Sequence, residues 1–368
     1  MSTHGQNKKC VEIINRLLFA WLAAIASLAG LYGQAPLERA ANQPVSDLGQ
    51  KAIRRLILGK GFVVHTFGFQ PLVRPLAITP DNWLGGPGNW STGTLWSTGA
   101  MPTSSNDALI NNSTPAAVVQ LNVSGTVNNL TIGSTSVLNF NNNNSLTIDG
   151  TTITNSNKTG TGGIILNSAG NLTDWIIGSS AVTLTGGGTV TLSNNLENRI
   201  YGAVAADVLT NANNTIQGSG QLGVGQMGLI NQSAGIIDAN QSTALTIHTS
   251  NGTTNAGTLE ATAGGNLILQ GDTYTNTGGT ILASGTGSVV SLQSPTINGG
   301  TLNTAGGGLI QASGNPTLNG VTNSGTYQLP NNNNTTLLGT ITNTGGIQGH
   351  GHSRQRRYSQ TDLLRRGH

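Results

Sequence analysis

Charged residues are scarce in this chain of 368 residues: they make up 8% of it, and aromatic residues make up 4%. Ordinary soluble domains carry roughly 25% charged residues. The chain has one cysteine, Cys10, which excludes a disulfide within the molecule. Such a composition cannot fill a large mixed core. It suits a thin β structure with small aliphatic residues inside and Thr, Ser and Asn outside.

Basic residues are few in the central part of the chain, although the net charge is +3. Between Asp81 and Ile347 there are nine acidic residues and two basic ones, Lys158 and Arg199. Nucleic-acid binding requires Lys and Arg along one face to neutralise phosphates. The acidic central part therefore excludes a nucleic-acid partner.

A repeat runs from Ile230 to Gly346. Its period is about 22 residues, which is within the range of solenoid proteins. Each repeat begins with a phrase such as Gly257-Thr-Leu-Glu-Ala261. Three columns keep this spacing: Ala239, Ala261, Ala283 and Ala305; Leu245, Leu267 and Val289; and Thr254, Asn276 and Asn298. In a solenoid each unit covers the apolar face of its neighbour. The repeat therefore predicts a stacked architecture.

Each repeat contains short aliphatic sets, such as Leu267-Ile-Leu269, bounded by Gly, Asn, Thr and Ser, and no window has helical spacing. The sequence therefore predicts an all-β fold, a right-handed parallel β-helix of about ten or eleven coils. Stacked Asn side chains are expected at the corners as hydrogen-bonded ladders. The candidates are Asn255, Asn276, Asn298, Asn323 and Asn343.

The strand pattern also covers 118–196, where coils that are interrupted or shorter than the regular repeat are expected. The predicted strands there are Leu130–Ile132, Leu146–Ile148, Ile164–Leu166, Val182–Leu184 and Val190–Leu192. Polar tracts at 141–144 and 331–334 are expected to be loops. Residues 198–212, with Arg199, Tyr201 and Asp207, interrupt the rhythm and are predicted to form a loop or short helix that projects from the stack.

The N-terminus has the pattern of a secretory signal, in which the basic residues Lys8, Lys9 and Arg16 precede an apolar run at 17–31. The run is short for a membrane span, which takes about 20 residues. We expect a signal helix, cleavage after Ala29 and a mature chain without a membrane span. An uncleaved anchor or a buried helix is the alternative.

The expected organisation has five parts: a signal peptide at 1–29, a linker or pro-segment at 30–80, an N-terminal cap at 81–117, β-helix repeats at 118–347 and a basic disordered tail at 348–368. Trp83, Trp90 and Trp96 lie within the cap segment. We expect them to cover the open end of the first coil, because terminal repeats need caps. Exposed aromatic rings that stack on sugars are the alternative.

Two phrases resemble known proteins. The first runs from Asp81-Asn-Trp-Leu-Gly-Gly-Pro-Gly-Asn-Trp90 through Trp96 to the aliphatic Ala108-Leu-Ile110, and the second is Asn213-Asn-Thr-Ile-Gln-Gly-Ser-Gly-Gln-Leu-Gly223. Both are similar to bacterial surface β-helix proteins, of the autotransporter passenger and filamentous-haemagglutinin kind, and the likeness covers about 81–347. It implies export to the cell surface or outer membrane. Such proteins normally carry a C-terminal anchoring module, and nothing after Gly346 resembles one.

Residues 218–223 also fit the Gly-x-Gly-x-x-Gly pattern of dinucleotide sites, and Asp238 stands at the distance after Gly218 where a ribose-binding acid would be expected. That site requires a helix whose N-terminus receives the pyrophosphate. The Gly-rich residues at 224–228 and the β pattern that follows favour another β coil. We therefore expect no cofactor.

A β-helical polysaccharide lyase or hydrolase is the main alternative, and it would need clustered carboxylates, or Ca²⁺ with a base. Asp238 and Glu260 are expected to stack one coil apart, with Leu282 ending the column, and Asp149 and Asp174 could stack. Such a pair would hold Ca²⁺ weakly or would simply be a solvated pair on the outer face. No catalytic or metal site is expected, because His248 is isolated and the pair His350 and His352 falls short of the four ligands of structural zinc.

The function expected from the sequence is that of an exported, non-catalytic, adhesin-like passenger that mediates attachment or surface structure through many weak polar contacts. Its partner would be a host or environmental glycan or protein surface. A self-assembling matrix protein that associates through the β-helix ends is a further alternative. The tail after Gly346 contains five Arg residues and no aliphatic alternation. We expect it to be a frame-shifted end of a longer repeat protein.

Overall fold

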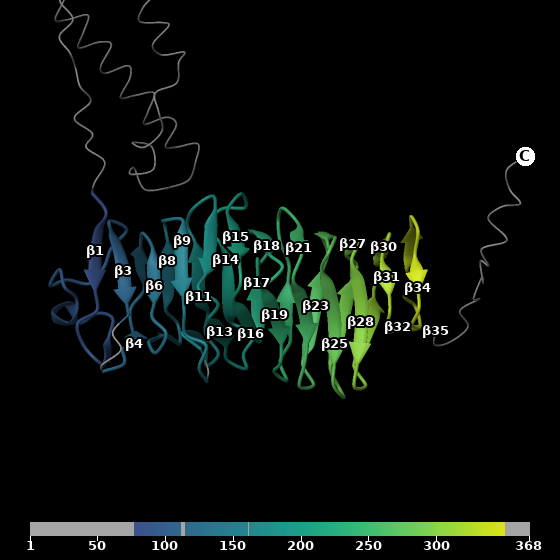
Figure 1. Ribbon diagram of the computed structural model, residues 1–368, viewed down its shortest axis with the longest axis horizontal. Helices are drawn as coiled ribbons and strands as arrows, with labels where there is room; N and C mark the ends of the chain where they lie inside the picture. Colours follow the sequence, from purple (N-terminus) through teal and green to yellow (C-terminus); the bar gives the residue numbers. More distant parts are fainter. Residues whose placement is uncertain (1–76, 112–114, 161, 350–368) are drawn as a thin grey trace, which may run out of the picture. The chain divides into compact units, whose positions relative to one another are not determined.

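The computed structural model describes residues 77–111, 115–160 and 162–349, and these form one parallel β-solenoid of about 11 turns (Figure 1). The predicted signal peptide, the basic tail from residue 350 and most of the predicted linker lie outside the described residues. Among the described residues the only helical element is a 3₁₀ turn, Gly93–Leu95. The predicted all-β, parallel fold is therefore confirmed.

Three parallel sheets run along the stack, and each coil after the first contributes one strand to each sheet in turn. Sheet 1 contains β1 (Thr79–Asn82), β3 (Asn106–Ile110), β6 (Leu130–Ile132), β9 (Thr152–Asn155), β12 (Val182–Thr185), β15 (Val208–Asn211), β18 (Gly228–Asn231), β21 (Thr253–Asn255), β24 (Thr273–Thr275), β27 (Thr296–Asn298), β30 (Thr317–Asn319) and β33 (Thr336–Leu338). Sheet 2 contains β2 (Pro87–Asn89), β4 (Val118–Leu121), β7 (Val137–Asn141), β10 (Ile164–Asn167), β13 (Thr189–Leu192), β16 (Thr215–Gly218), β19 (Ile236–Ala239), β22 (Thr258–Ala261), β25 (Thr280–Ser284), β28 (Thr301–Ala305), β31 (Thr322–Asn323) and β34 (Thr342–Asn343). Sheet 3 contains β5 (Gly125–Val127), β8 (Ser145–Ile148), β11 (Thr173–Ile177), β14 (Asn198–Gly202), β17 (Gly220–Leu222), β20 (Leu245–Ile247), β23 (Asn266–Gln270), β26 (Val289–Gln293), β29 (Leu309–Ser313), β32 (Thr326–Leu329) and β35 (Gly346–Gly349).

Alternation along each strand separates the core from the surface, because successive side chains of a strand point to opposite faces. In β23, Leu267 and Leu269 are buried, whereas Asn266, Ile268 and Gln270 are partly exposed. The five strands predicted between residues 118 and 196 are all present, as β6, β8, β10, β12 and β13. The interior is thus a single stack of mostly aliphatic side chains, with a few aromatic ones such as Phe140 and Trp175.

Coil length varies more than the sequence predicts. Ala239, Ala261 and Ala283 pair in one column, as expected, but Ala283 then pairs with Thr304, and Ala305 falls one position away. Leu267 likewise pairs with Val290 and not with Val289. In the third column Thr254 pairs with Thr275 and not with Asn276. The regular spacing of the repeat is wrong at these three points, because turns between strands take up one residue more or fewer without moving the strands.

The earlier coils include long ones, not only short ones. The step from Val119 to its partner Leu138 is shorter than the regular repeat, but the next step, from Leu138 to its partner Ile164, is longer. The expectation of shorter or interrupted coils was therefore incomplete. Residues 198–212 are a second correction, since they form β14 and β15 within the stack and do not project from it. Arg199 and Tyr201 lie on the outer face, whereas Asn198, Asp207 and Asn211 are buried among the aliphatic residues, which hides the aliphatic pattern.

A buried asparagine ladder lies at the bend between sheets 1 and 2. Asn211 Nδ2 donates to Asn231 Oδ1 at 2.9 Å, Asn231 Nδ2 to Asn255 Oδ1 at 2.8 Å, and Asn255 Nδ2 to Asn276 Oδ1 at 2.7 Å. The predicted ladder is confirmed, but its membership differs. Asn298 pairs in register with Thr275 and accepts a hydrogen bond from Asn319 in a separate ladder. Asn323 and Asn343 form a third, since Asn323 Nδ2 donates to Asn343 Oδ1 at 2.7 Å.

The three tryptophans near the start of the solenoid form one buried cluster, with exposed fractions of 0%, 0% and 1% for Trp83, Trp90 and Trp96. The Trp96 ring meets the other two edge-on, with centroids 5.1 and 4.9 Å away. Sheet 3 begins only at β5, where a Cβ on Gly125 would lie 3.4 Å from Trp90 Nε1. The rings therefore fill the place of a third strand in the first coil. Stacking of exposed rings on sugars was the wrong alternative for this cluster, because none of the three is exposed.

Candidate functional site

The glycine motif at residues 218–223 lies on β16 and β17 and is part of the stack. Gly218 has a positive φ of 121°, and a Cβ there would overlap the carbonyl oxygen of Leu192 in the preceding coil. These glycines allow two backbones to approach closely. In the described residues a strand follows the motif where a dinucleotide site would need a helix.

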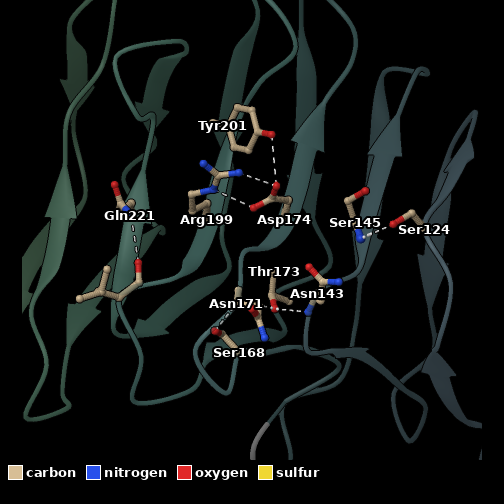
Figure 2. A network of polar contacts seen from close by, with 11 residues as sticks. Ser124, Asn143, Ser145, Ser168, Asn171, Thr173, Asp174, Arg199, Tyr201 and Gln221 are labelled. Atoms are coloured by element: carbon tan, nitrogen blue, oxygen red, sulfur yellow. Dashed lines mark hydrogen bonds and ion pairs between the residues drawn. The ribbon is translucent and has the colours of Figure 1, made fainter.

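One charged cluster lies on the outer face of sheet 3, where Asp174 of β11 faces Arg199 and Tyr201 of β14 (Figure 2). Arg199 Nε donates to Asp174 Oδ1 at 2.8 Å, and Nη2 donates to Oδ2 at 2.6 Å. The Tyr201 hydroxyl donates to the same Oδ2 at 3.3 Å, and the Arg199 guanidinium carbon lies 4.9 Å from the Tyr201 ring centroid. This is a bidentate ion pair, which is the stronger and more directional kind.

The electrostatics of this cluster suit binding better than proton transfer. The hydrogen bond to Asp174 raises the pKa of the Arg199 guanidinium, so Arg199 stays protonated. Burial raises the pKa of Tyr201, which stays neutral. Arg199 and Tyr201 therefore keep their protons, and both hydrogen-bond to Asp174. The cluster offers polar groups for binding but no group placed to transfer a proton.

The sequence did not reveal this cluster, and its alternative partner for Asp174 was wrong. Asp174 pairs in register with Ser145 and Arg199, whereas Asp149 follows the Ile148 position and lies beside Gly178. The coil that links these strands is longer than the repeat, so the register could not be extrapolated. A usable signal exists, because Arg199 is the single arginine of the repeat region and would be expected to pair with an acid.

Asp238 and Glu260 pair in register on β19 and β22, and Glu260 pairs next with Leu282, as the repeat predicts. The Thr262 hydroxyl lies 2.9 Å from both carboxylate oxygens of Asp238. Burial raises the pKa of Asp238, and burial together with the charge of Asp238 raises the pKa of Glu260. Asp238 is therefore buried and Glu260 partly buried, so the pair is not the solvated pair on the outer face that the sequence suggested.

This carboxylate pair gives a pH prediction. Because the folded pKa values of both acids are raised, the folded state binds their protons more tightly than the unfolded state. The pair's contribution to stability is then greatest in acid and is lost as the pH rises from about 4, where unfolded carboxyls titrate, through the higher folded pKa values.

Denaturant unfolding of the wild type and of the Asp238→Asn, Glu260→Gln double variant measures this effect from pH 4 to 8. At pH 7 the variant is expected to be more stable by about 0.5 to 1 kcal/mol, since like charges opposite each other on neighbouring strands are removed. The difference between the two proteins should shrink in acid. A difference that grows as the pH falls would contradict the prediction. Both proteins share all other acidic residues, so the effects of those residues cancel in the difference between the two unfolding free energies.

A row of threonines runs along the outer face of sheet 2, next to the carboxylates. Eight positions pair in register from β13 to β34, and seven of them are threonine: Thr189, Thr215, Ile236, Thr258, Thr280, Thr301, Thr322 and Thr342. Paired strands place these hydroxyls about 4.8 Å apart. The sequence shows the repeated Gly-Thr phrase but not the direction in which the threonine points.

No group of three or more His, Cys, Asp or Glu side chains lies close enough to hold a metal ion within the part of the chain that the structure describes. Over the same residues, no helix is long and apolar enough to span a membrane. Comparison of the chain with protein-family models, with curated proteins and with solved structures gives no significant match. The fold assignment therefore rests on the strand pairing itself.

Proposed function

We propose that this protein is an exported, cell-surface β-solenoid that attaches to an extended polymer, in the manner of an autotransporter passenger or adhesin, and that it is non-catalytic. The observation that carries the proposal is the threonine row of sheet 2, which repeats the same hydroxyl and methyl group once per coil. A regular row suits a regular partner. Many weak contacts in a line give avidity that a single contact lacks.

The neighbouring column on sheet 2 adds hydrogen-bonding groups to the same face at Gln217, Glu260 and Asn303. In the same column Asp238 is 8% exposed, and Leu282 interrupts the polar groups. Sugar hydroxyls both donate and accept hydrogen bonds, so such a face fits a polysaccharide chain better than an apolar surface would. The partner class we favour is therefore a repeating glycan.

The test replaces the hydroxyls without changing the shape of the strands. In the variant Thr258→Val, Thr280→Val, Thr301→Val and Thr322→Val, each change exchanges a hydroxyl for a methyl group at similar β-propensity. The matched control is the row on sheet 1, with Thr273, Thr296, Thr317 and Thr336 changed to Val; these also pair in register. Circular dichroism checks that both variants fold.

Binding is measured by co-sedimentation with insoluble cellulose, chitin and xylan and with collagen fibres. Each lost hydrogen bond contributes about 0.5 to 1.5 kcal/mol, so the sheet 2 variant should bind at least about tenfold more weakly, and the sheet 1 variant should bind like the wild type. Equal binding by all three proteins, or no binding to any material, would refute the proposal. Release of reducing ends or unsaturated sugars in the same incubations would overturn its non-catalytic part.

Export is tested separately, by N-terminal sequencing of protein recovered outside the cells. The apolar run at 17–31 supports a mature start near Gly30. Extracellular protein that still begins at Met1 would contradict this part of the proposal.

A further inference from the structure

Three asparagines of the chain are followed directly by glycine, and each of them lies in or next to a strand of sheet 1: Asn251, Asn298 and Asn319. An asparagine side chain can be attacked by the backbone nitrogen of the next residue, which closes a five-membered ring. Glycine favours this attack because it has no Cβ to hinder the approach. The sequence makes the three Asn-Gly pairs alike, and the structure distinguishes them.

The backbone nitrogen that would attack is already hydrogen-bonded in two of the pairs. Gly299 N donates to the Asn319 carbonyl at 2.8 Å, and Gly320 N donates to the Leu338 carbonyl at 2.9 Å. Gly252 N donates no hydrogen bond within the described residues. Ring closure at Gly252 therefore requires no contact between coils to open first, whereas at the other two glycines it does.

The Asn251 side chain is exposed, and it also holds two turns together. Its Nδ2 donates to the Ala205 carbonyl at 2.6 Å, and the Ser250 hydroxyl donates to the same oxygen at 2.7 Å. Ala205 lies between β14 and β15, and Asn251 lies between β20 and β21, so this contact joins turns two coils apart and crosses the turn at 223–227. A change in the Asn251 side chain therefore affects a contact between distant parts of the chain.

We propose that Asn251 is a site of spontaneous deamidation that loosens the turn at 203–207. Gly252 N bonds to Asn251 Cγ, and the bond from Cγ to Nδ2 breaks. The backbone N–H proton passes through solvent to the departing nitrogen, which leaves as ammonia. Water then opens the cyclic imide at either carbonyl carbon and gives aspartate or isoaspartate, without any oxidation or reduction.

The product reverses the contact with Ala205. An asparagine amide donates hydrogen bonds through its nitrogen, whereas an ionised carboxylate only accepts them. A carboxylate at position 251 would face the Ala205 carbonyl oxygen, and the Ser250 hydroxyl alone would still donate to that oxygen. Both ends of the contact lie in turns, so the strands should keep their register. The modification stands independently of the attachment function.

Peptide mapping by mass spectrometry compares the three pairs in the full mature chain, incubated at pH 7.4 and 37 °C. Asn251 should convert at least about tenfold faster than Asn298 or Asn319, because those two require local opening of the stack. Isoaspartate should appear among the products. In the guanidinium-unfolded chain, which is the matched control, the three rates should be similar. Equal rates in the folded chain, or slower conversion at Asn251, would overturn the proposal. Aspartate without isoaspartate would overturn the ring-closing step.

Hydrogen–deuterium exchange tests the loosened turn, whose amides at Ala203, Val204 and Asp207 are all hydrogen-bonded in the structure. Exchange at these amides should rise at least about fivefold in Asn251→Asp, which stands in for the product, and in wild type after long incubation. Asn251→Gln keeps the amide but closes a ring poorly, so its exchange should not change during incubation. Unchanged exchange in Asn251→Asp would overturn the loosening. Faster exchange along the whole solenoid would replace it with a global loss of stability.

Discussion

Replacement of Leu267 with aspartate is expected to unfold several coils at once and to lower the unfolding free energy by more than about 4 kcal/mol, because a buried leucine is lost and an unpaired charge takes its place. Leu267 is fully buried and pairs with Leu245 below and Val290 above. The coil that contains Leu267 therefore packs against both Leu245 and Val290. In a stacked array the stability of one unit depends on its neighbours, so protease resistance should be lost across about residues 245–290.

The control lies one residue away on the same strand. Ile268 points outward, and Ile268→Asp places the same charge in water instead of in the core. We expect a change below about 1 kcal/mol, as for ordinary surface substitutions. Limited proteolysis with mass spectrometry distinguishes the two variants. A single local cleavage in Leu267→Asp with intact flanking coils, or equal damage in both variants, would contradict the stacked interior.

Replacement of Asn255 with alanine is expected to cost about 2 to 5 kcal/mol, because buried polar groups on both sides lose their partner. Asn255 accepts from Asn231 and donates to Asn276 and to the Gly257 carbonyl, and all four residues lie at the bend between sheets 1 and 2. After the change, the Asn276 amide oxygen loses its donor inside the protein, where water cannot replace it. Equilibrium unfolding in guanidinium measures the loss.

Asn298→Ala is the matched control, because Asn298 also belongs to an asparagine ladder but is partly exposed. Water replaces the lost partner there, and we expect a cost of about 0.5 to 1.5 kcal/mol. Similar losses in both variants would show that ladder hydrogen bonds contribute equally at the surface and in the interior. That result would contradict the importance assigned to burial.

The regular part of the repeat made much of the fold predictable. Between residues 235 and 283 the steps along sheets 2 and 3 keep one length, so the sequence correctly placed Leu267 inside and stacked Asp238 on Glu260. Strand alternation and short aliphatic sets identified the β structure because they reflect one buried face per strand. The tryptophan cluster was predictable because an uncovered β end is unfavourable.

The irregular coils account for the errors. Trp175 pairs with Leu146 in the coil before it and with Ile200 in the coil after it, and both steps are longer than the regular repeat and unequal to each other. No fixed period could therefore bring Asp174 to Arg199. Turns set coil length, and a turn gains or loses a residue without changing any strand. The same effect displaced Ala305 by one position.

The exposure of Leu337 in the last described coil was hidden for another reason. The exposure of Leu337 depends on what covers it and not on its own sequence context, since its partner Leu318 has the same aliphatic side chain and is buried. A repeat pattern reports which face of a strand is apolar. It does not report whether a further coil follows to cover that face.

Distances between spin labels along one column test the stacked register most directly. In a Cys10→Ser background, Thr189→Cys is paired in turn with Thr280→Cys and Thr322→Cys, which lie four and six strands away in sheet 2. At about 4.8 Å per strand, pulsed electron resonance should give label separations of about 19 and about 29 Å, with narrow distributions. Separations that do not grow by this step per coil, or broad distributions at both positions, would contradict the parallel β-solenoid.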